Sequence, residues 1–177
     1  MNLIQNKKII GFAAHSGTGK TTLIKEIIKI LIKLDYRVSV IKHAHHDFDI
    51  DLPGKDSYEI RKSGAENMLV SSKNRWALMH ENKYHDELSL IDLIGKLDNL
   101  KYDLILIEGF KTESFPKIEL YREEINKNRG LLSDSDENIV AIATEKLTKL
   151  NTSLALLDIN KPHDIANFII NFLDIGK

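Results

Sequence analysis

Three segments of the chain combine residue types that could do chemistry, and the clearest is AHSGTGKT, residues 14–21. Gly17 and Gly19 allow a tight turn in which backbone N–H groups face a phosphate. Lys20 brings a positive charge to the outer phosphates, and the hydroxyl of Thr21 is suited to bind Mg²⁺. This spacing predicts a loop that binds the phosphates of a nucleotide.

The residues on either side of this loop have the pattern that it requires. An apolar run over 7–14 predicts a strand before the loop, and the Leu and Ile spacing over 20–34 predicts an amphipathic helix after it. This helix adds the positive end of its dipole to the site. Ala14 replaces the first glycine of the motif, at a position that needs only a small residue. The remaining loop residues that we expect around the phosphates are His15, Ser16 and Thr18.

The second segment is DLILIEGF, residues 103–110, an apolar run that ends on an acid. An acid at the end of a buried strand beside a phosphate loop commonly holds Mg²⁺ through water or orients the attacking water. Glu108 is therefore a candidate for catalysis and for metal binding, although a solvated strand-end acid has the same pattern. Gly109 permits a close backbone turn near a γ-phosphate. Asp103 lies at the start of the run, on the far edge, and is left out of the site.

The third segment is KHAHHDFDID, residues 42–51. Its acids are spaced like the start of an EF-hand loop, but Leu52 replaces the glycine and Tyr58 replaces the last ligand, which excludes that motif. The segment follows a predicted strand. We therefore expect an active-edge loop in which Asp47 or Asp49 helps to hold Mg²⁺ or positions a reacting group.

Two other interpretations of this segment stay open. His43, His45 and His46 could form a zinc or nickel site. Adjacent residues of a strand point to opposite faces, which makes it difficult for His45 and His46 to reach one ion. The segment could also be a polar loop without a ligand.

Apolar strands alternate with helices along the chain, which predicts a mostly parallel sheet covered by helices on both faces. We expect a three-layer α/β fold in a single domain over 1–177, with two antiparallel additions, the hairpin 67–81 and the strand 117–123. The predicted strands are 7–14, 36–43, 67–72, 75–81, 102–109, 117–123, 138–144 and 153–159, and the predicted helices are 20–34, 56–63, 86–98 and 162–174. Ligands of such sheets bind outside the carboxyl ends of the strands, where all three segments lie.

The composition narrows the class of protein. The 177 residues carry a formal net charge of −1, so we expect neither nucleic acid nor a membrane as partner. There is no cysteine, which excludes disulfides and thiolate metal sites. The first residues, MNLIQNKKII, lack the apolar core of a signal peptide, and we expect a cytoplasmic protein.

The three segments together resemble the molybdopterin-guanine dinucleotide biosynthesis protein B (MobB) family of P-loop proteins. The stretches that carry the resemblance are GFAAHSGTGKTTL, IKHAHHDFDIDLPGKDSYEIRKSGA and DLILIEGFKTESFPKIE. The resemblance implies a P-loop NTPase fold and a GTP-binding adapter with weak, Mg²⁺-dependent GTPase activity. It also implies a homodimer that assists the guanylyltransferase of molybdenum cofactor synthesis and works with molybdenum insertion proteins.

The resemblance also assigns roles to residues. It places phosphate binding on Gly17, Gly19, Lys20, Thr21 and Thr22. It places the acidic roles on Asp47, Asp49 and Glu108.

Selection of guanine has no clear signal in the sequence, since no N-K-x-D segment is present. A carboxylate is needed to accept from N1 and N2 of guanine, and Asp158 and Glu145 are candidates by their position at strand ends. Two alternative functions remain, a small-molecule kinase with Asp47 or Asp49 as base, and a GTPase that delivers nickel. The sequence shows no arginine-rich lid for the first, and it lacks cysteine and a long histidine run for the second.

Overall fold

The computed structural model describes residues 7–44, 48–82, 87–126, 129–147 and 150–177. The chain forms two compact units, a larger one of Met1–His43 with Leu90–Lys177, and a smaller one of Ala44–Ser89. The expectation of a single nucleotide-binding domain stays a prediction. No helix in the described ranges is long and apolar enough to span a bilayer.

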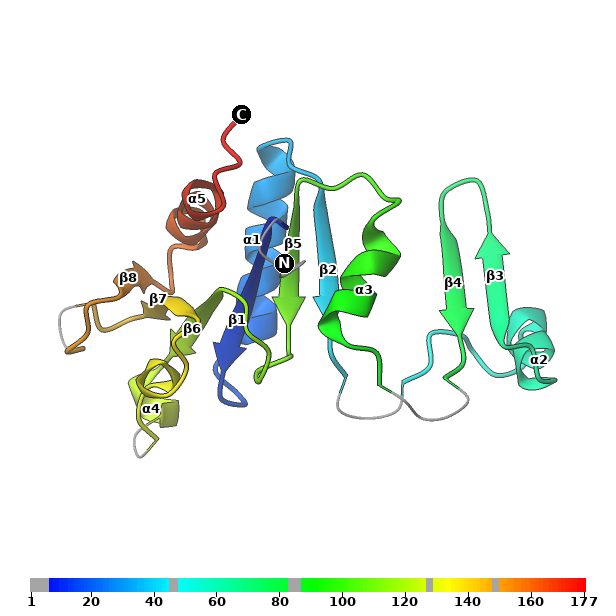
Figure 1. The fold of residues 1–177 in the computed structure, drawn as a ribbon, viewed down its shortest axis with the longest axis horizontal. Helices are drawn as coiled ribbons and strands as arrows, with labels where there is room; N and C mark the ends of the chain where they lie inside the picture. The colour runs from blue at the N-terminus through cyan, green and yellow to red at the C-terminus, as the bar shows by residue number, and fades with distance from the viewer. Residues whose placement is uncertain (1–6, 45–47, 83–86, 127–128, 148–149) are drawn as a thin grey trace. The chain divides into compact units, whose positions relative to one another are not determined.

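The larger unit is built on a six-stranded sheet in the order β2-β5-β1-β6-β7-β8, which Figure 1 shows from right to left. Every described pair of neighbouring strands in this sheet is parallel. All six carboxyl ends therefore lie along one edge. The strands are β1 (Ile9–Ala14), β2 (Val38–Lys42), β5 (Leu104–Glu108), β6 (Lys117–Tyr121), β7 (Ile139–Thr144) and β8 (Ala155–Asp158).

Helices cover both faces of this sheet, because its strands are apolar on both sides. Ile10 and Phe12 of β1 pack with α1 (Lys20–Lys33) and α5 (Pro162–Phe172) in one apolar cluster. Ile9 packs with α3 (Leu90–Leu97) in a second cluster. Neighbouring residues of one strand thus serve opposite layers, which gives the expected three-layer arrangement. The short elements α4 (Glu123–Asn126) and the 3₁₀ turn Leu132–Asp134 lie between β6 and β7.

The prediction that strand 117–123 is an antiparallel addition is wrong. β6 lies inside the sheet and is parallel to both β1 and β7. Its sequence, KIELY, alternates charged and apolar residues, which is typical of a strand with one face in water. Here the charged face is buried instead, with Lys117 2% exposed and Glu119 fully covered.

Two segments satisfy the buried charges of β6. Lys117 Nζ donates to the carbonyl of Glu113 at 2.7 Å and pairs with Asp136 Oδ2 at 2.9 Å. Glu119 accepts hydrogen bonds from the backbone N–H groups of Leu132 and Ser133 at 2.8 and 3.0 Å. Burial raises the pKa of the Glu119 carboxyl, and these backbone donors oppose the shift. β6 can therefore lie inside the parallel sheet, because nearby loops supply hydrogen-bond and ion-pair partners for its buried Lys117 and Glu119.

The smaller unit contains α2 (Asp56–Lys62) and an antiparallel hairpin of β3 (Asn67–Ser71) and β4 (Trp76–His80). The hairpin forms a sheet of its own. Of the described residues in this unit, Arg61 alone is buried. It hydrogen-bonds to Glu81 and to both carboxylate oxygens of Asp49, the latter at 2.6 and 2.7 Å. In the described part of this unit, the ion pairs of Arg61 and the backbone pairing of the hairpin are found in place of a buried apolar core.

Replacement of two glycines of the larger unit by alanine should change the free energy of unfolding in opposite directions. A Cβ on Gly11 would lie 2.3 Å from Cε2 of the buried Phe115 ring. We expect Gly11→Ala to lower the free energy of unfolding by about 1–3 kcal/mol, the usual effect of overpacking. Gly95 in α3 has open space around its Cβ position, and Gly95→Ala should raise stability by about 0.5–1 kcal/mol. Urea titration followed by circular dichroism measures both, and equal effects would contradict this packing.

Candidate functional site

The loop between β1 and α1 has the backbone conformation that a phosphate cradle requires. Gly17 and Gly19 have φ of 83° and 90°, in the left-handed region that favours glycine. A Cβ at either position would meet no atom within 4 Å. The requirement here is therefore conformational and not one of space. Gly19 is also the N-cap of α1, so the N–H groups of the first turn open toward the loop.

The other predicted loop residues surround this turn. The His15 carbonyl accepts hydrogen bonds from the N–H of the buried Thr18 at 3.4 Å and from its hydroxyl at 2.6 Å. Ser16 and Thr22 are exposed, the latter in the first turn of α1. The structure thus brings His15 to Thr22 together around one turn.

Glu108 meets the loop from the neighbouring strand. Glu108 is opposite Phe12 of β1 and Lys42 of β2 in the parallel register. Its Oε1 accepts a hydrogen bond from the Thr21 hydroxyl at 3.2 Å, and its Oε2 pairs with Lys42 Nζ at 3.2 Å. The predicted acid and the predicted hydroxyl are therefore adjacent. Lys42 was not among the predicted site residues, although it ends a strand at the same edge.

The pKa of Lys20 depends on burial and on the charged residues around Glu108. Burial lowers the pKa of its ammonium group, and Lys111 and Lys42 act in the same direction, while Glu108 opposes them. Cations gathered around one acid favour an anionic ligand, because its charge would offset their mutual repulsion. Lys111, which follows β5, therefore belongs to this electrostatic neighbourhood.

Gly109 is required by its backbone conformation, as expected for a close turn, and also by close packing. Its φ is 106°, and a Cβ there would lie 2.5 Å from Cβ of His43. The N–H of His43 donates to the Glu108 carbonyl at 2.8 Å, and the His43 ring stacks on Phe110 at 4.7 Å between centroids. Close packing of the β2 and β5 ends thus also explains this glycine.

The structure separates Asp103 from the site, as expected. Asp103 lies at the opposite edge and accepts hydrogen bonds from the backbone N–H and the guanidinium of Arg37, at 2.6 and 2.7 Å. These hydrogen bonds from Arg37 hold the pKa of the Asp103 carboxyl far below its usual range.

Asp158, a predicted guanine-binding residue, ends β8, where its Oδ1 accepts from the N–H of Asn160 at 2.9 Å.

Asp49 belongs to the smaller unit, where both of its carboxylate oxygens accept from Arg61. Hydrogen bonds from Arg61 lower the pKa of this carboxyl. A role for Asp49 at a metal ion stays a prediction. His45, His46 and Asp47 lie outside the described residues, so the structure describes neither the metal-binding nor the catalytic role expected of them.

The larger unit fits Mg²⁺ in the manner of a phosphate-loop site. Mg²⁺ binds through one or two protein oxygens together with substrate phosphates. The Thr21 hydroxyl and the Glu108 carboxylate supply such oxygens next to the loop. In the part of the chain that is described, no three His, Asp or Glu residues form a metal-binding group. A metal here would therefore depend on the phosphates for most of its ligands.

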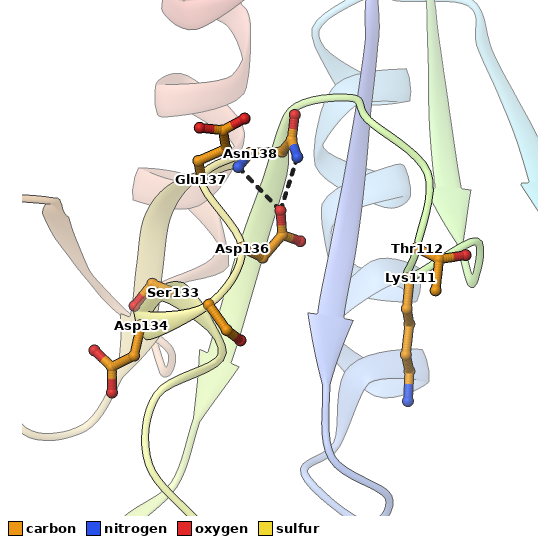
Figure 2. A pocket seen from close by; sticks show the side chains of 8 residues that line it. Lys111, Thr112, Ser133, Asp134, Asp136, Glu137 and Asn138 are labelled. Carbon is orange, nitrogen blue, oxygen red and sulfur yellow. Dashed lines mark hydrogen bonds between the residues drawn. The ribbon is translucent and has the colours of Figure 1, made fainter.

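A hollow of about 610 Å³ lies beside this neighbourhood, lined by Lys111, Thr112 and residues 133–138. Figure 2 shows Asp136 accepting hydrogen bonds from the backbone and the side chain of Asn138, at 3.0 and 2.8 Å. Asp136 also pairs with Lys117. Both carboxylate oxygens of Asp136 are therefore used in contacts that connect the loop 133–138 to β6.

Arg122 is a second residue at the site that was not predicted from the sequence. It follows β6, and its Nε–H donates to the backbone carbonyl of Thr18 in the phosphate loop at 3.1 Å. Its Nη1 lies 3.7 Å from Oε2 of Glu145, which follows β7. An antiparallel β6 would have placed Arg122 at the opposite edge of the sheet. The incorrect prediction of the direction of β6 is therefore the reason why Arg122 was not expected at the site.

Comparison with known proteins agrees with this geometry. The sequence model of the family described as Molybdopterin guanine dinucleotide synthesis protein B matches residues 9–145. The chain belongs to this family. It is 46% identical to the molybdopterin-guanine dinucleotide biosynthesis adapter protein of Escherichia coli over 165 residues, 93% of each chain. It is 41% identical to the adapter protein of Haemophilus influenzae, over 93% of this chain and 89% of that one.

Solved structures support the fold assignment of this MobB-family chain. Bacillus subtilis MobB has a TM-score of 0.70 at 23% identity, covering 96% of this chain and 98% of that one. A MobB homologue from Bacillus stearothermophilus has a TM-score of 0.68 at 19% identity, covering 96% and 99%. HypB from Helicobacter pylori, solved with nickel, gives 0.50 at 14% identity, covering 96% and 88%. Such identities show the fold alone, which is that of P-loop NTPases with an added hairpin.

The two acids at opposite ends of β5, Asp103 just before the strand and Glu108 at its end, should have separable roles. We expect Glu108→Gln to weaken Mg²⁺-dependent nucleotide binding and leave the unfolding free energy nearly unchanged. We expect Asp103→Asn to leave nucleotide binding unchanged and to lower stability at neutral pH. Because the native pKa of Asp103 is depressed, its contribution is present above about pH 4 and is lost as the pH falls through the lower native value.

Calorimetry with Mg²⁺ and a nucleotide measures binding, and urea titrations at several pH values measure stability. The stability difference between parent and Asp103→Asn should shrink below about pH 4. A difference that is constant with pH would contradict the assigned pairing with Arg37.

Proposed function

We propose that the protein is a GTP-binding adapter with weak, Mg²⁺-dependent GTPase activity in the synthesis of molybdopterin guanine dinucleotide. The observation that carries this proposal is the contact of Thr21 with Glu108 beside the phosphate loop, in a chain of the MobB family. Relatives at 46% and 41% identity are named as adapter proteins of this biosynthesis.

The chain's own residues would divide the work on the nucleotide. The N–H groups around Gly17 and Gly19 would hold the phosphates, and Lys20 would neutralise the outer ones. Thr21 and Glu108 would hold Mg²⁺, which supplies charge stabilisation on the phosphates when bound.

The adapter role implies partners, and we propose the guanylyltransferase that attaches GMP to molybdopterin and the molybdenum insertion proteins. We also propose that the protein works as a homodimer in the cytoplasm. The sequence offers two candidate surfaces for a dimer, the strand 117–123 and the hairpin 67–81. β6 lies between β1 and β7, so it has no free edge for pairing. The hairpin remains, with Leu69 and Leu78 opposite each other and 59% and 54% exposed. Trp76 lies on the same face and is 54% exposed.

The nucleotide assignment is tested with Lys20→Ala. Loss of a charge-assisted contact should weaken GTP binding by about 1.5–3 kcal/mol, or roughly 10- to 100-fold. Calorimetry with GTP and ATP in the presence of Mg²⁺ measures this effect and the base preference. Lys25→Ala is a matched control, since Lys25 is an exposed lysine of the same helix. Equal GTP affinity in parent and Lys20→Ala would overturn the proposal, and rapid phosphorylation of a small acceptor would favour a kinase.

The dimer is tested at the hairpin. Trp76→Ala removes a large exposed aromatic side chain and should weaken the dimer by about 2 kcal/mol, or roughly 30-fold. Sedimentation velocity over a concentration series measures this, and Lys73→Ala at the hairpin turn is the control. A parent protein that is monomeric at all concentrations, or a dimer that is indifferent to Trp76→Ala, would argue against this surface.

A further inference from the structure

We propose that Glu145 is the carboxylate that selects guanine, and that Arg122 positions it by tying it to the phosphate loop. This inference rests on the proposed function, because it concerns the base of the same nucleotide. It begins from two contacts of one arginine, to the Thr18 carbonyl at 3.1 Å and toward Glu145 Oε2 at 3.7 Å.

The sheet register places these residues in a row. Ala14 is opposite Leu120, and Leu120 is opposite Ala143, in parallel pairs. Arg122 and Glu145 each lie two residues beyond this line, on the side where the phosphate loop begins. Two strand spacings of about 4.8 Å put the end of β7 roughly 10 Å from the end of β1. This is the scale of the separation between the phosphates and the base of an extended nucleotide.

The environment of Glu145 suits a carboxylate that receives a ligand. Its Oε2 is covered from solvent and accepts no hydrogen bond from any residue that the structure describes. The side chain as a whole is 27% exposed, so it is not closed off from solvent. Arg122 thus restrains one oxygen and leaves the other side of the group for a base.

Guanine is the base that this group would choose. It presents two donors side by side, N1–H and the N2 amino group, and a carboxylate only accepts. Adenine presents an acceptor at N1, which a carboxylate would repel. Asp158 is the less suitable acid, because its Oδ1 caps a turn through the N–H of Asn160 and its strand lies one spacing farther away.

The decisive variant changes the preferred base and does not only remove binding. Xanthine keeps N1–H but has a carbonyl in place of the amino group. A glutamine amide accepts from N1–H and donates to that carbonyl. We therefore expect Glu145→Gln to weaken GTP and strengthen XTP, with a change in their affinity ratio on the order of 100-fold. A merely structural role for Glu145 would not produce tighter binding of another nucleotide.

The test is calorimetry of the full chain with GTP, XTP and ATP in the presence of Mg²⁺. Glu124→Gln, on the exposed side of the neighbouring α4, is the matched control and should keep the parent ratio. Parallel loss of GTP and XTP in Glu145→Gln, or no change, overturns the inference. A switch in Asp158→Asn in place of Glu145→Gln also overturns it. If the parent binds no nucleotide, the proposed function fails as well.

Arg122 is tested as a positioning residue. Arg122→Ala should lower the preference for GTP over XTP and ATP about tenfold, because Glu145 is then no longer oriented. Arg122→Lys keeps a positive charge beside Glu145 and should restore part of that preference. Equal preference in all three proteins, measured where each is folded by circular dichroism, would exclude this role.

Discussion

The parallel pairing of β1 with β5 and β6 decides where the reactive side chains of the larger unit lie. Parallel strands end at one edge, so each strand delivers the residues that follow it to the same line. The phosphate loop follows β1, Glu108 ends β5 and Arg122 follows β6. Thr21 can therefore touch Glu108, and Arg122 can reach the Thr18 carbonyl, without any long excursion of the chain. The position of the site therefore depends more on the parallel direction of the strands than on any single residue.

Charge is distributed unevenly along this edge. Glu108, Lys42 and Lys111 all act on the charge of Lys20, while Arg122 and Glu145, which follow β6 and β7, face each other farther along the edge. The first group suits the phosphates of a nucleotide, and the second suits a neutral, polar base. Burial of Lys117 and Glu119 in β6 costs desolvation, which the loops at 113 and 131–136 offset with hydrogen bonds and an ion pair. These loops therefore stabilise the strand that carries Arg122.

Much of this arrangement could be predicted from the sequence, and the failures have physical causes. The glycine spacing at Gly17 and Gly19 and the apolar run before Glu108 are local signals, and both lie where expected. The direction of β6 could not be predicted, because a buried Lys117 and Glu119 imitate the alternation of a half-exposed strand. Arg122 and Lys42 were missed since their roles depend on which strand lies beside which. The positive φ of Gly109 agrees with the turn expected there, whereas its close approach to His43 is a tertiary contact that the sequence does not show.

The single buried arginine of the smaller unit has a consequence for motion. Arg61 is held by Asp49 and Glu81, and none of the described apolar side chains around it is buried. A segment without a dry core opens locally at low free-energy cost. Its amide hydrogens should therefore exchange with solvent far sooner than those of β1 or β5. Salt should hasten that exchange, since it screens charged pairs.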